Sequence, residues 1–383
     1  MTSSLVELRR TLHRSAERSG NEAATAEIVL EALRALDPDT IATGIGGHGI
    51  VAAFEGSVKG RTVLIRSDMD ALPLPDDPRL AWASEDPVTA HLCGHDGHMA
   101  TLMGVAHALR DRRPARGRIV LLFQPAEEIG AGAHAVLHDP AFDPFRPDMV
   151  FAQHNLPGYP LGSIVLRKGP FASASRGMIA RFEGRSSHAA EPHNGASPIP
   201  AVARLAQVLA TLPQHATALH ETAQVTVVGM DAGGPAFGTN PSSGTCMATL
   251  RAHEQVVMDR ISEAARSRVE GLARMYDLEC SLEWVEEFPA TINDPDLTDL
   301  VADSANSLSM NTEWREHAFA WSEDFGHFTS AHPGVLFGIG SGNRQPALHA
   351  PGYDFPDALI EPGSRLLSEI AHRALERAHA NEN

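Results

Sequence analysis

Two short apolar runs limit the fold of this chain more than any other feature. Val63-Leu64-Ile65 and residues 119–123 are apolar at every position, so neither run has a polar face to turn towards water. Strands of this kind are buried on both faces, as in the centre of a parallel sheet. The first run leads into Ser67-Asp68-Met69-Asp70 and the second ends at residues 124–128. The pattern predicts an α/β fold with polar groups at strand ends, where open parallel sheets place ligand sites.

The flanking segments alternate between helix and strand patterns. Apolar spacing predicts helices over residues 5–18, 22–36, 95–110 and 362–379, and strands over residues 49–55, 61–65, 119–123 and 149–152. Segments 297–308 and 334–339 have the same α/β character.

The element order changes to βαββαβ in the middle of the chain. The expected elements are a strand at 176–184, a helix at 198–212, strands at 223–230 and 244–251, a helix at 255–276 and a strand at 278–284. This is the ferredoxin-like order, and 383 residues exceed one ordinary core. We therefore expect two domains. Residues 1–173 and 286–383 form a catalytic α/β/α domain with a central, mostly parallel sheet, and residues 174–285 form an inserted ferredoxin-like domain.

Composition excludes several classes of partner. The 31 basic and 48 acidic residues give a net charge of −17, which repels phosphate backbones, so no nucleic acid partner is expected. No run of 18 apolar residues predicts a membrane span. Cys93, Cys246 and Cys280 are too few for a disulfide framework, which favours a cytoplasmic protein. Cys246 and Cys280 fall in predicted strands and are expected to be buried thiols.

The segment Cys93-Gly94-His95-Asp96-Gly97-His98 is the strongest local signal for chemistry. A thiolate and an imidazole two residues apart, in a loop loosened by glycine, can bind the same metal ion. The alternative is a helix N-terminus with incidental histidines.

Glu127-Glu128 follows a buried strand and a proline. Adjacent side chains at a strand end point in different directions, so one carboxylate can bind metal while the other acts as a general base. A solvated pair of loop acids is the alternative.

His154 and His349 complete a possible ligand set. His154 ends a predicted strand, and His349 lies in a proline-flanked loop. Either one alone is more often a structural histidine. The combined set would hold two ions bridged by the cysteine thiolate or a water, and its members are Cys93, His95, Glu128, His154 and His349.

Four further residues are candidates with open alternatives. Asp68 and Asp70 can orient a ligand histidine or act as outer metal ligands. His188 can stabilise the oxyanion of a tetrahedral intermediate, or it is a surface loop histidine. Arg251 can pair with a substrate carboxylate, or it is a surface arginine.

Taken in order, these motifs resemble the aminoacylase, hippurate hydrolase and auxin-conjugate amidohydrolase branch of the di-metal aminoacylase and carboxypeptidase superfamily. The resemblance spans nearly the whole chain and rests on residues 66–73, 93–98, 123–128, His154, residues 187–190 with Pro192-His193, residues 322–325 and Leu348-His349. It implies the same five metal ligands, with Glu127 as general base.

The resemblance also concerns the inserted domain. It implies that residues 174–285 form a dimerisation lid in a homodimer, and that His188 reaches an active site, in some relatives that of the partner subunit. Family lids commonly carry asparagine directly after the phenylalanine matching Phe237, whereas here Gly238 occupies that place and Asn240 follows two residues later. Asn240 is therefore the candidate for substrate binding. Two more departures, Ala350 after the metal histidine and Asn155-Leu156-Pro157 after His154, concern specificity.

The expected function is hydrolysis of the amide bond in a small N-acyl amino acid or similar conjugate. Water activated by two divalent ions (Zn, Mn, Co or Ni) would attack the carbonyl, with Glu127 carrying the proton. A dipeptidase or carboxypeptidase is the nearest alternative. A cysteine hydrolase with Cys93 as nucleophile and a non-catalytic binding protein are the other two.

Overall fold

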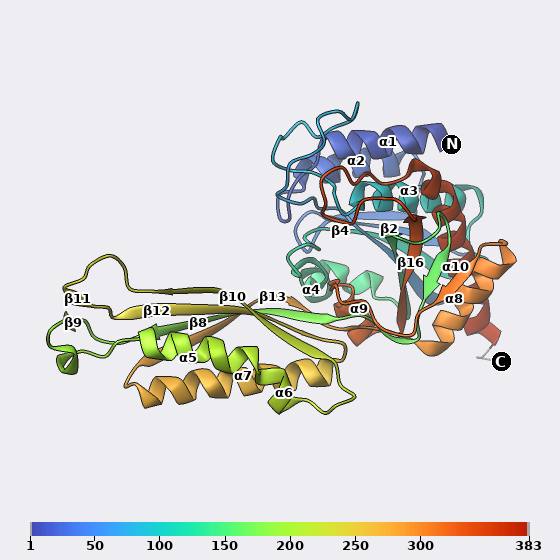
Figure 1. Ribbon diagram of the computed structural model, residues 1–383. Helices are drawn as coiled ribbons and strands as arrows, with labels where there is room; N and C mark the ends of the chain where they lie inside the picture. Colours follow the sequence, from blue (N-terminus) through green and yellow to red (C-terminus); the bar gives the residue numbers. More distant parts are fainter. Residues whose placement is uncertain (1, 381–383) are drawn as a thin grey trace. The chain divides into compact units, whose positions relative to one another are not determined.

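The computed structural model describes residues 2–380 and divides into two compact units (Figure 1). The first unit runs to Phe171 and resumes at Thr291–Ala318 and from Glu323 onwards. The second unit comprises Ala172–Ala290 and Phe319–Ser322. The predicted fold class, an α/β protein with an inserted domain, is confirmed.

An eight-stranded sheet forms the centre of the first unit, in the order β1-β2-β4-β3-β5-β16-β6-β15. The strands are β1 (Thr40–Ile45), β2 (Gly49–Glu55), β3 (Val58–Asp68), β4 (Arg116–Gln124), β5 (Met149–Pro157), β6 (Ile164–Leu166), β15 (Thr312–Trp314) and β16 (Gly334–Gly342). The four central strands β4, β3, β5 and β16 run parallel, and Leu64 pairs with both Val120 and Val150. Their carboxyl ends therefore meet at one edge of the sheet.

Helices cover both faces of this sheet. Val63 and Ile65 belong to a core formed with α1 (Thr2–Arg14), α2 (Ala23–Arg34), α3 (His95–Asp111), α8 (Pro295–Ser307) and α10 (Ile360–Ala380). Leu64 lies between them, points the other way and is also fully buried. On that side α4 (Gly132–His138) and α9 (Gly326–Ala331) contact β4 and β16. The apolar runs are thus strands buried on both faces, as predicted. A short pair, β7 (Gly169–Ala172) and β14 (Thr291–Asn293), completes the unit.

The second unit has the predicted βαββαβ order. Its elements are β8 (Ala174–Glu183), α5 (Ile199–Ala210), α6 (Leu212–Ala216), β10 (Ala223–Ala232), β12 (Ser243–Ala252), α7 (Gln255–Met275) and β13 (Glu279–Phe288). The four strands form an antiparallel sheet in the order β10-β12-β8-β13, with α5, α6 and α7 on one side of it (Figure 1). Two very short strands, β9 (Ser187–His188) and β11 (Thr239–Asn240), pair as a separate ribbon.

The two cysteines of this unit differ in exposure. Cys246 lies on the inner strand β12 and is fully buried, as expected. Cys280 is exposed, so the prediction of a buried thiol was wrong there. The physical reason is its place on β13, an edge strand with a neighbour on one side only.

Within residues 2–380, no helix combines the length and the apolar character that crossing a bilayer requires.

Close packing of α3 on α10 depends on Gly104. A Cβ there would lie 2.1 Å from Ser364 Oγ, and this hydroxyl is held by the carbonyls of Thr101 and Ile360 at 2.8 and 2.7 Å. We expect Gly104→Ala to lower the free energy of unfolding by about 1–3 kcal/mol through overpacking. The measurement is urea unfolding followed by circular dichroism.

The matched control is Gly271, near the C-terminal end of α7, where a Cβ would meet no atom within 4 Å. Gly271→Ala should raise stability by about 0.5–1 kcal/mol, because alanine loses less backbone entropy in a helix. A Gly104→Ala protein as stable as the wild type would contradict the packing argument.

Candidate metal centre

Acids and a histidine meet where the central strands end. Asp68 ends β3 and pairs with Gln124, the last residue of β4, while Arg66 pairs with Ala152 of β5. Glu127 follows β4 by three residues, and His154 lies two residues beyond Ala152. The parallel register alone therefore brings these polar side chains to one edge of the sheet.

The loop before α3 adds a thiol and an imidazole. Gly94 has a φ of +91°, in the left-handed region, and a Cβ there would lie 2.6 Å from Asn155 Oδ1. Only glycine fits this turn without strain. It separates Cys93 from His95, the first residue of α3, and both side chains are buried.

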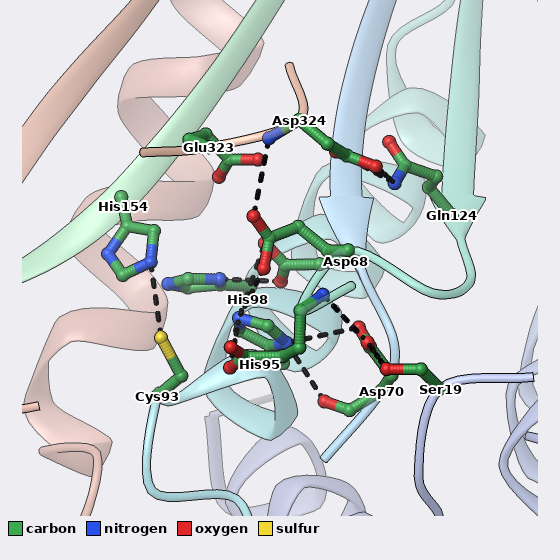
Figure 2. A network of polar contacts seen from close by, with 12 residues as sticks. Ser19, Asp68, Asp70, Cys93, His95, His98, Gln124, His154, Glu323 and Asp324 are labelled. Atoms are coloured by element: carbon green, nitrogen blue, oxygen red, sulfur yellow. Dashed lines mark hydrogen bonds and ion pairs between the residues drawn. The ribbon is translucent and has the colours of Figure 1, made fainter. Parts of the chain in front are cut away.

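The five predicted ligands lie together in the first unit. Cys93, His95 and His154 offer donor atoms within 4.8 Å of one another, with Cys93 Sγ 3.5 Å from His154 Nε2 (Figure 2). Cys93, Glu128 and His349 form a second such group, in which Glu128 Oε1 lies 3.6 Å from His349 Nε2. The Cys93 thiol belongs to both groups. It is therefore the donor that the two groups have in common.

The orientation of the histidines fits metal binding. Nδ1 of His95 lies 2.8 Å from the carbonyl oxygen of Asp70, and Nδ1 of His154 lies 2.9 Å from that of Asn155. A carbonyl only accepts, so each Nδ1 carries the hydrogen and each Nε2 is the atom left for an ion. His95 Nε2 and Glu128 Oε1 are buried, and neither has a hydrogen-bond partner within residues 2–380.

The local charges favour added cations. Burial raises the pKa of the Cys93 thiol well above its usual value, and Glu128 adds to the shift. Burial, with Asp70 and Asp68 contributing, raises the pKa of Glu128 to about 7. Burial lowers the pKa of His95, but the Asp68 carboxylate and Cys93 outweigh it and raise this pKa well above the usual value. Each shift marks a place where positive charge is favoured, and divalent ions supply such charge.

His349 approaches from a loop near the C-terminus. Its backbone has a φ of +64°, and its amide donates to the carbonyl of Leu92 at 2.9 Å. That bond ties the His349 loop to the residue before Cys93. The His349 side chain is half exposed, so this side of the site is open within the first unit.

Asp70 holds two of the predicted ligands. Its carbonyl contacts His95, and its Oδ2 accepts from the amide of Glu128 at 3.0 Å and from Ser19 Oγ at 2.6 Å (Figure 2). Asp68 accepts from His98 Nδ1 at 2.7 Å and from Arg66 at 2.8 Å. Its Oδ2 also lies 3.7 Å from His95 Nε2. Asp70 is thus placed to orient ligands, whereas Asp68 borders the ion groups directly.

Glu127 lies against a buried acidic cluster held by Arg66. Arg66 donates to Glu323 Oε1 at 2.9 Å and to Asp324 Oδ1 at 2.7 Å. The amide of Asp324 donates to Glu127 Oε1 at 3.3 Å, and Glu127 Oε2 lies 3.9 Å from His95 Nε2. Burial, followed by the charge of Glu323, raises the pKa of Glu127 well above its usual value. One oxygen of Glu127 is therefore held while the other faces the ligand groups.

Three residues of this site were missed as functional groups in the sequence. Glu323 and Asp324 surround Glu127, and His98 links Asp68 to Asn155 Oδ1, 2.5 Å from its Nε2. An acidic pair inside an aromatic-rich stretch, Phe319 to Phe328, is the signal that could have found the first two.

The three remaining candidates lie in the second unit. The β9-β11 ribbon brings together His188, which pairs with Thr239, and Asn240, whose Nδ2 donates to Ser187 Oγ at 3.3 Å. Arg251 lies on β12 and donates to Ala320 O at 3.1 Å and to Ser322 Oγ at 2.9 Å. His188 and Asn240 thus share one surface ribbon, and Arg251 belongs to the sheet.

Comparison with known proteins agrees with this geometry. The chain is 30% identical over 377 residues to N-acetyl-L-cysteine deacetylase from Bacillus subtilis, covering 97% of this chain and 88% of the relative. Hippurate hydrolase from Campylobacter jejuni is 28% identical over 371 residues, 96% of each chain. The crystal structure of the Bacillus subtilis YXEP protein, a dinuclear metal binding peptidase of the M20 family, superposes with a TM-score of 0.82 at 26% identity over 98% of both chains.

A family model, described as Peptidase family M20/M25/M40, matches residues 64–373. That match contains every predicted metal ligand and the whole second unit. The chain therefore belongs to peptidase family M20/M25/M40, and it is a metal-dependent hydrolase of amide bonds that uses two divalent metal ions.

Proposed function

We propose that the protein hydrolyses the amide bond of N-acyl amino acids, with Cys93, His95, Glu128, His154 and His349 as metal ligands. The observation that carries the proposal is the pair of ligand groups that share Cys93, with Glu127 beside them. The names of two relatives, an N-acetylcysteine deacetylase and a hippurate hydrolase, support an acyl group on an amino acid as the substrate class.

Two divalent ions held by these five residues would supply Lewis acidity, which would polarise an amide carbonyl and lower the pKa of water. Glu127 acts as the general base: its Oε2, which lies 3.9 Å from His95 Nε2, accepts the proton of the attacking water and later delivers it to the leaving amine. Asp324 holds Oε1 through its amide, which fixes the direction of the carboxylate. Asp70 orients His95 and Glu128.

The second unit is proposed to supply the remaining substrate contacts. His188 is the candidate for stabilising the oxyanion of the tetrahedral intermediate. Asn240, next to it in the ribbon, and Arg251 are the candidates for binding the substrate carboxylate. We propose that this unit acts as the lid of the active site.

Peptide hydrolysis is the second candidate, because the YXEP protein is described as a peptidase. A screen of N-acetyl and N-benzoyl amino acids against dipeptides separates the two. Faster turnover of the acyl amino acids supports the first candidate, and turnover of dipeptides alone contradicts it.

Metal removal should abolish activity. We expect dialysis against EDTA to remove two metal ions per chain and to abolish hydrolysis. Added Zn²⁺, Mn²⁺, Co²⁺ or Ni²⁺ should restore the metal content and the activity. The measurements are elemental analysis and turnover of the best substrate. A cysteine hydrolase would instead keep its activity without metal and lose it to iodoacetamide.

Replacing the general base should separate chemistry from metal binding. Glu127→Gln keeps the side-chain shape but cannot accept a proton, so kcat should fall by about 10²- to 10⁴-fold. The two ions should remain, because Glu128 and the other ligands are unchanged. Glu7→Gln, on the surface of α1, is the control and should have wild-type kcat. A Glu127→Gln protein with normal kcat would exclude Glu127 as the base.

We further propose a homodimer formed through β10, and a cytoplasmic location that free Cys93, Cys246 and Cys280 support. β10 is an edge strand, and Val228 and Met230 on it are 63% and 57% exposed. Unpaired edges with apolar side chains favour pairing with a second copy.

Replacing both Val228 and Met230 by lysine should convert the proposed dimer to a monomer, because charged side chains on the edge strand oppose pairing. Light scattering after size-exclusion chromatography gives the mass. Val256→Lys on α7, where the side chain is 59% exposed, is the control that should leave the dimer intact. A dimer that persists in the Val228→Lys, Met230→Lys protein would place the interface elsewhere.

A further inference from the structure

Glu22 is a buried acid outside the ligand groups. It is 0% exposed and immediately precedes α2. Its side chain does not cap that helix. Instead Oε1 accepts from the amide of Ala126 and from that of Gly20, both at 2.8 Å. Glu22 therefore joins the α1–α2 connection to the turn that carries Glu127.

Ala126 has an unusual backbone. Its φ is +54°, in the left-handed region that residues with a Cβ rarely adopt. The turn is closed on the other side by the amide of Gly132, which donates to the Ala126 carbonyl at 3.0 Å. This conformation immediately precedes Glu127, so it sets the direction in which the next two side chains leave the strand.

The two glutamates after Ala126 face different partners. Glu127 lies against Asp324 and the acidic cluster, whereas Glu128 lies against Cys93 and His349. The amide of Glu128 is held by Asp70, which Ser19 of the α1–α2 connection supports (Figure 2). The amides before and after Glu127 are thus both fixed by buried carboxylates.

Burial of Glu22 is costly. Within residues 2–380 no basic side chain acts on its carboxylate, and its Oε2 has no hydrogen-bond partner. The N-terminus of α2, a helix of 12 residues, offsets part of this cost by its positive dipole end. A core position of this kind would be more stable with an apolar residue, unless the carboxylate serves the adjacent turn.

We propose that Glu22 is a positioning residue: by holding the amide of Ala126, it keeps this residue in the left-handed conformation that directs Glu127 to the acidic cluster and Glu128 to the metal ligands. The inference rests on the proposed function of Glu127 and Glu128. It predicts that loss of the Oε1 contact disturbs both metal affinity and kcat.

The test compares three substitutions at Glu22. Glu22→Ala removes the acceptor and Glu22→Asp withdraws it by one methylene, whereas Glu22→Gln keeps an acceptor oxygen at the same position. We expect the first two to weaken metal binding by about 10- to 100-fold, as loss of contacts behind metal ligands does, and to lower kcat. The metal affinity and kcat of Glu22→Gln should be much closer to the wild-type values. Affinity is measured by competition with a chromophoric chelator, and the ligand field by the visible spectrum of the Co²⁺ form.

Ala126→Gly provides the decisive second variant, because glycine adopts a positive φ without steric cost. In the Ala126→Gly background, Glu22→Ala or Glu22→Asp should recover a large part of the lost metal affinity and restore the Co²⁺ spectrum. Glu17→Ala is the control: Glu17 lies in the same connection and accepts from Thr25 at 2.7 Å, without contacting the turn. It should lower thermal stability while leaving the Co²⁺ spectrum unchanged.

Strictly additive effects of Ala126→Gly and the Glu22 substitutions would overturn the inference, as would wild-type metal affinity in Glu22→Asp. If Glu22→Ala does not fold, Glu22→Asp and Glu22→Gln carry the comparison. The Co²⁺ readout needs no substrate. A wild-type protein that binds two ions but cleaves no acyl amino acid would therefore contradict the proposed substrate and leave the result on Glu22 intact.

Discussion

The concentration of buried negative charge at the ends of the central strands is the constraint on which the rest of the site depends. Glu127 lies near Glu128 on one side and near the pair Glu323-Asp324 on the other. Arg66 binds Glu323, Asp324 and Asp68. One guanidinium cannot balance so many carboxylates in a low-dielectric interior. Added cations would therefore favour the ionised form of these carboxylates.

The same constraint explains the arrangement behind the ligands. Three of the five proposed ligands are held from behind by a neutral or acidic partner: His95 by the carbonyl of Asp70, His154 by that of Asn155, and Glu128 by the side chain of Asp70. Such contacts fix the tautomer and the direction of a ligand before an ion arrives. Glu22 and Ser19 extend this support by one further layer, into the connection between α1 and α2.

The chain divides its tasks between two units. The first unit contains all the proposed metal ligands, the proposed general base and the residues that contact them. The second unit, a ferredoxin-like domain, carries the β9-β11 ribbon with His188 and Asn240 and an exposed edge strand. A sheet with helices on one face leaves its edges available for pairing, which is compatible with the proposed interface between copies.

The sequence by itself determined the α/β class and the βαββαβ order of the inserted unit and predicted a set of candidate ligands, because apolar periodicity and polar strand ends are local patterns. It also predicted Glu127 beside the ligands. The tertiary structure alone decided that Cys93 is common to two ligand groups, that Cys280 is exposed on an edge strand, and that Glu323, Asp324 and Glu22 surround the turn at Glu127. These depend on contacts between residues far apart in the chain, such as Glu22 with Ala126, 104 positions apart, and Glu127 with Asp324, 197 positions apart, and on the left-handed backbone of Ala126. No local pattern encodes either, because each arises only when the whole sheet edge is assembled.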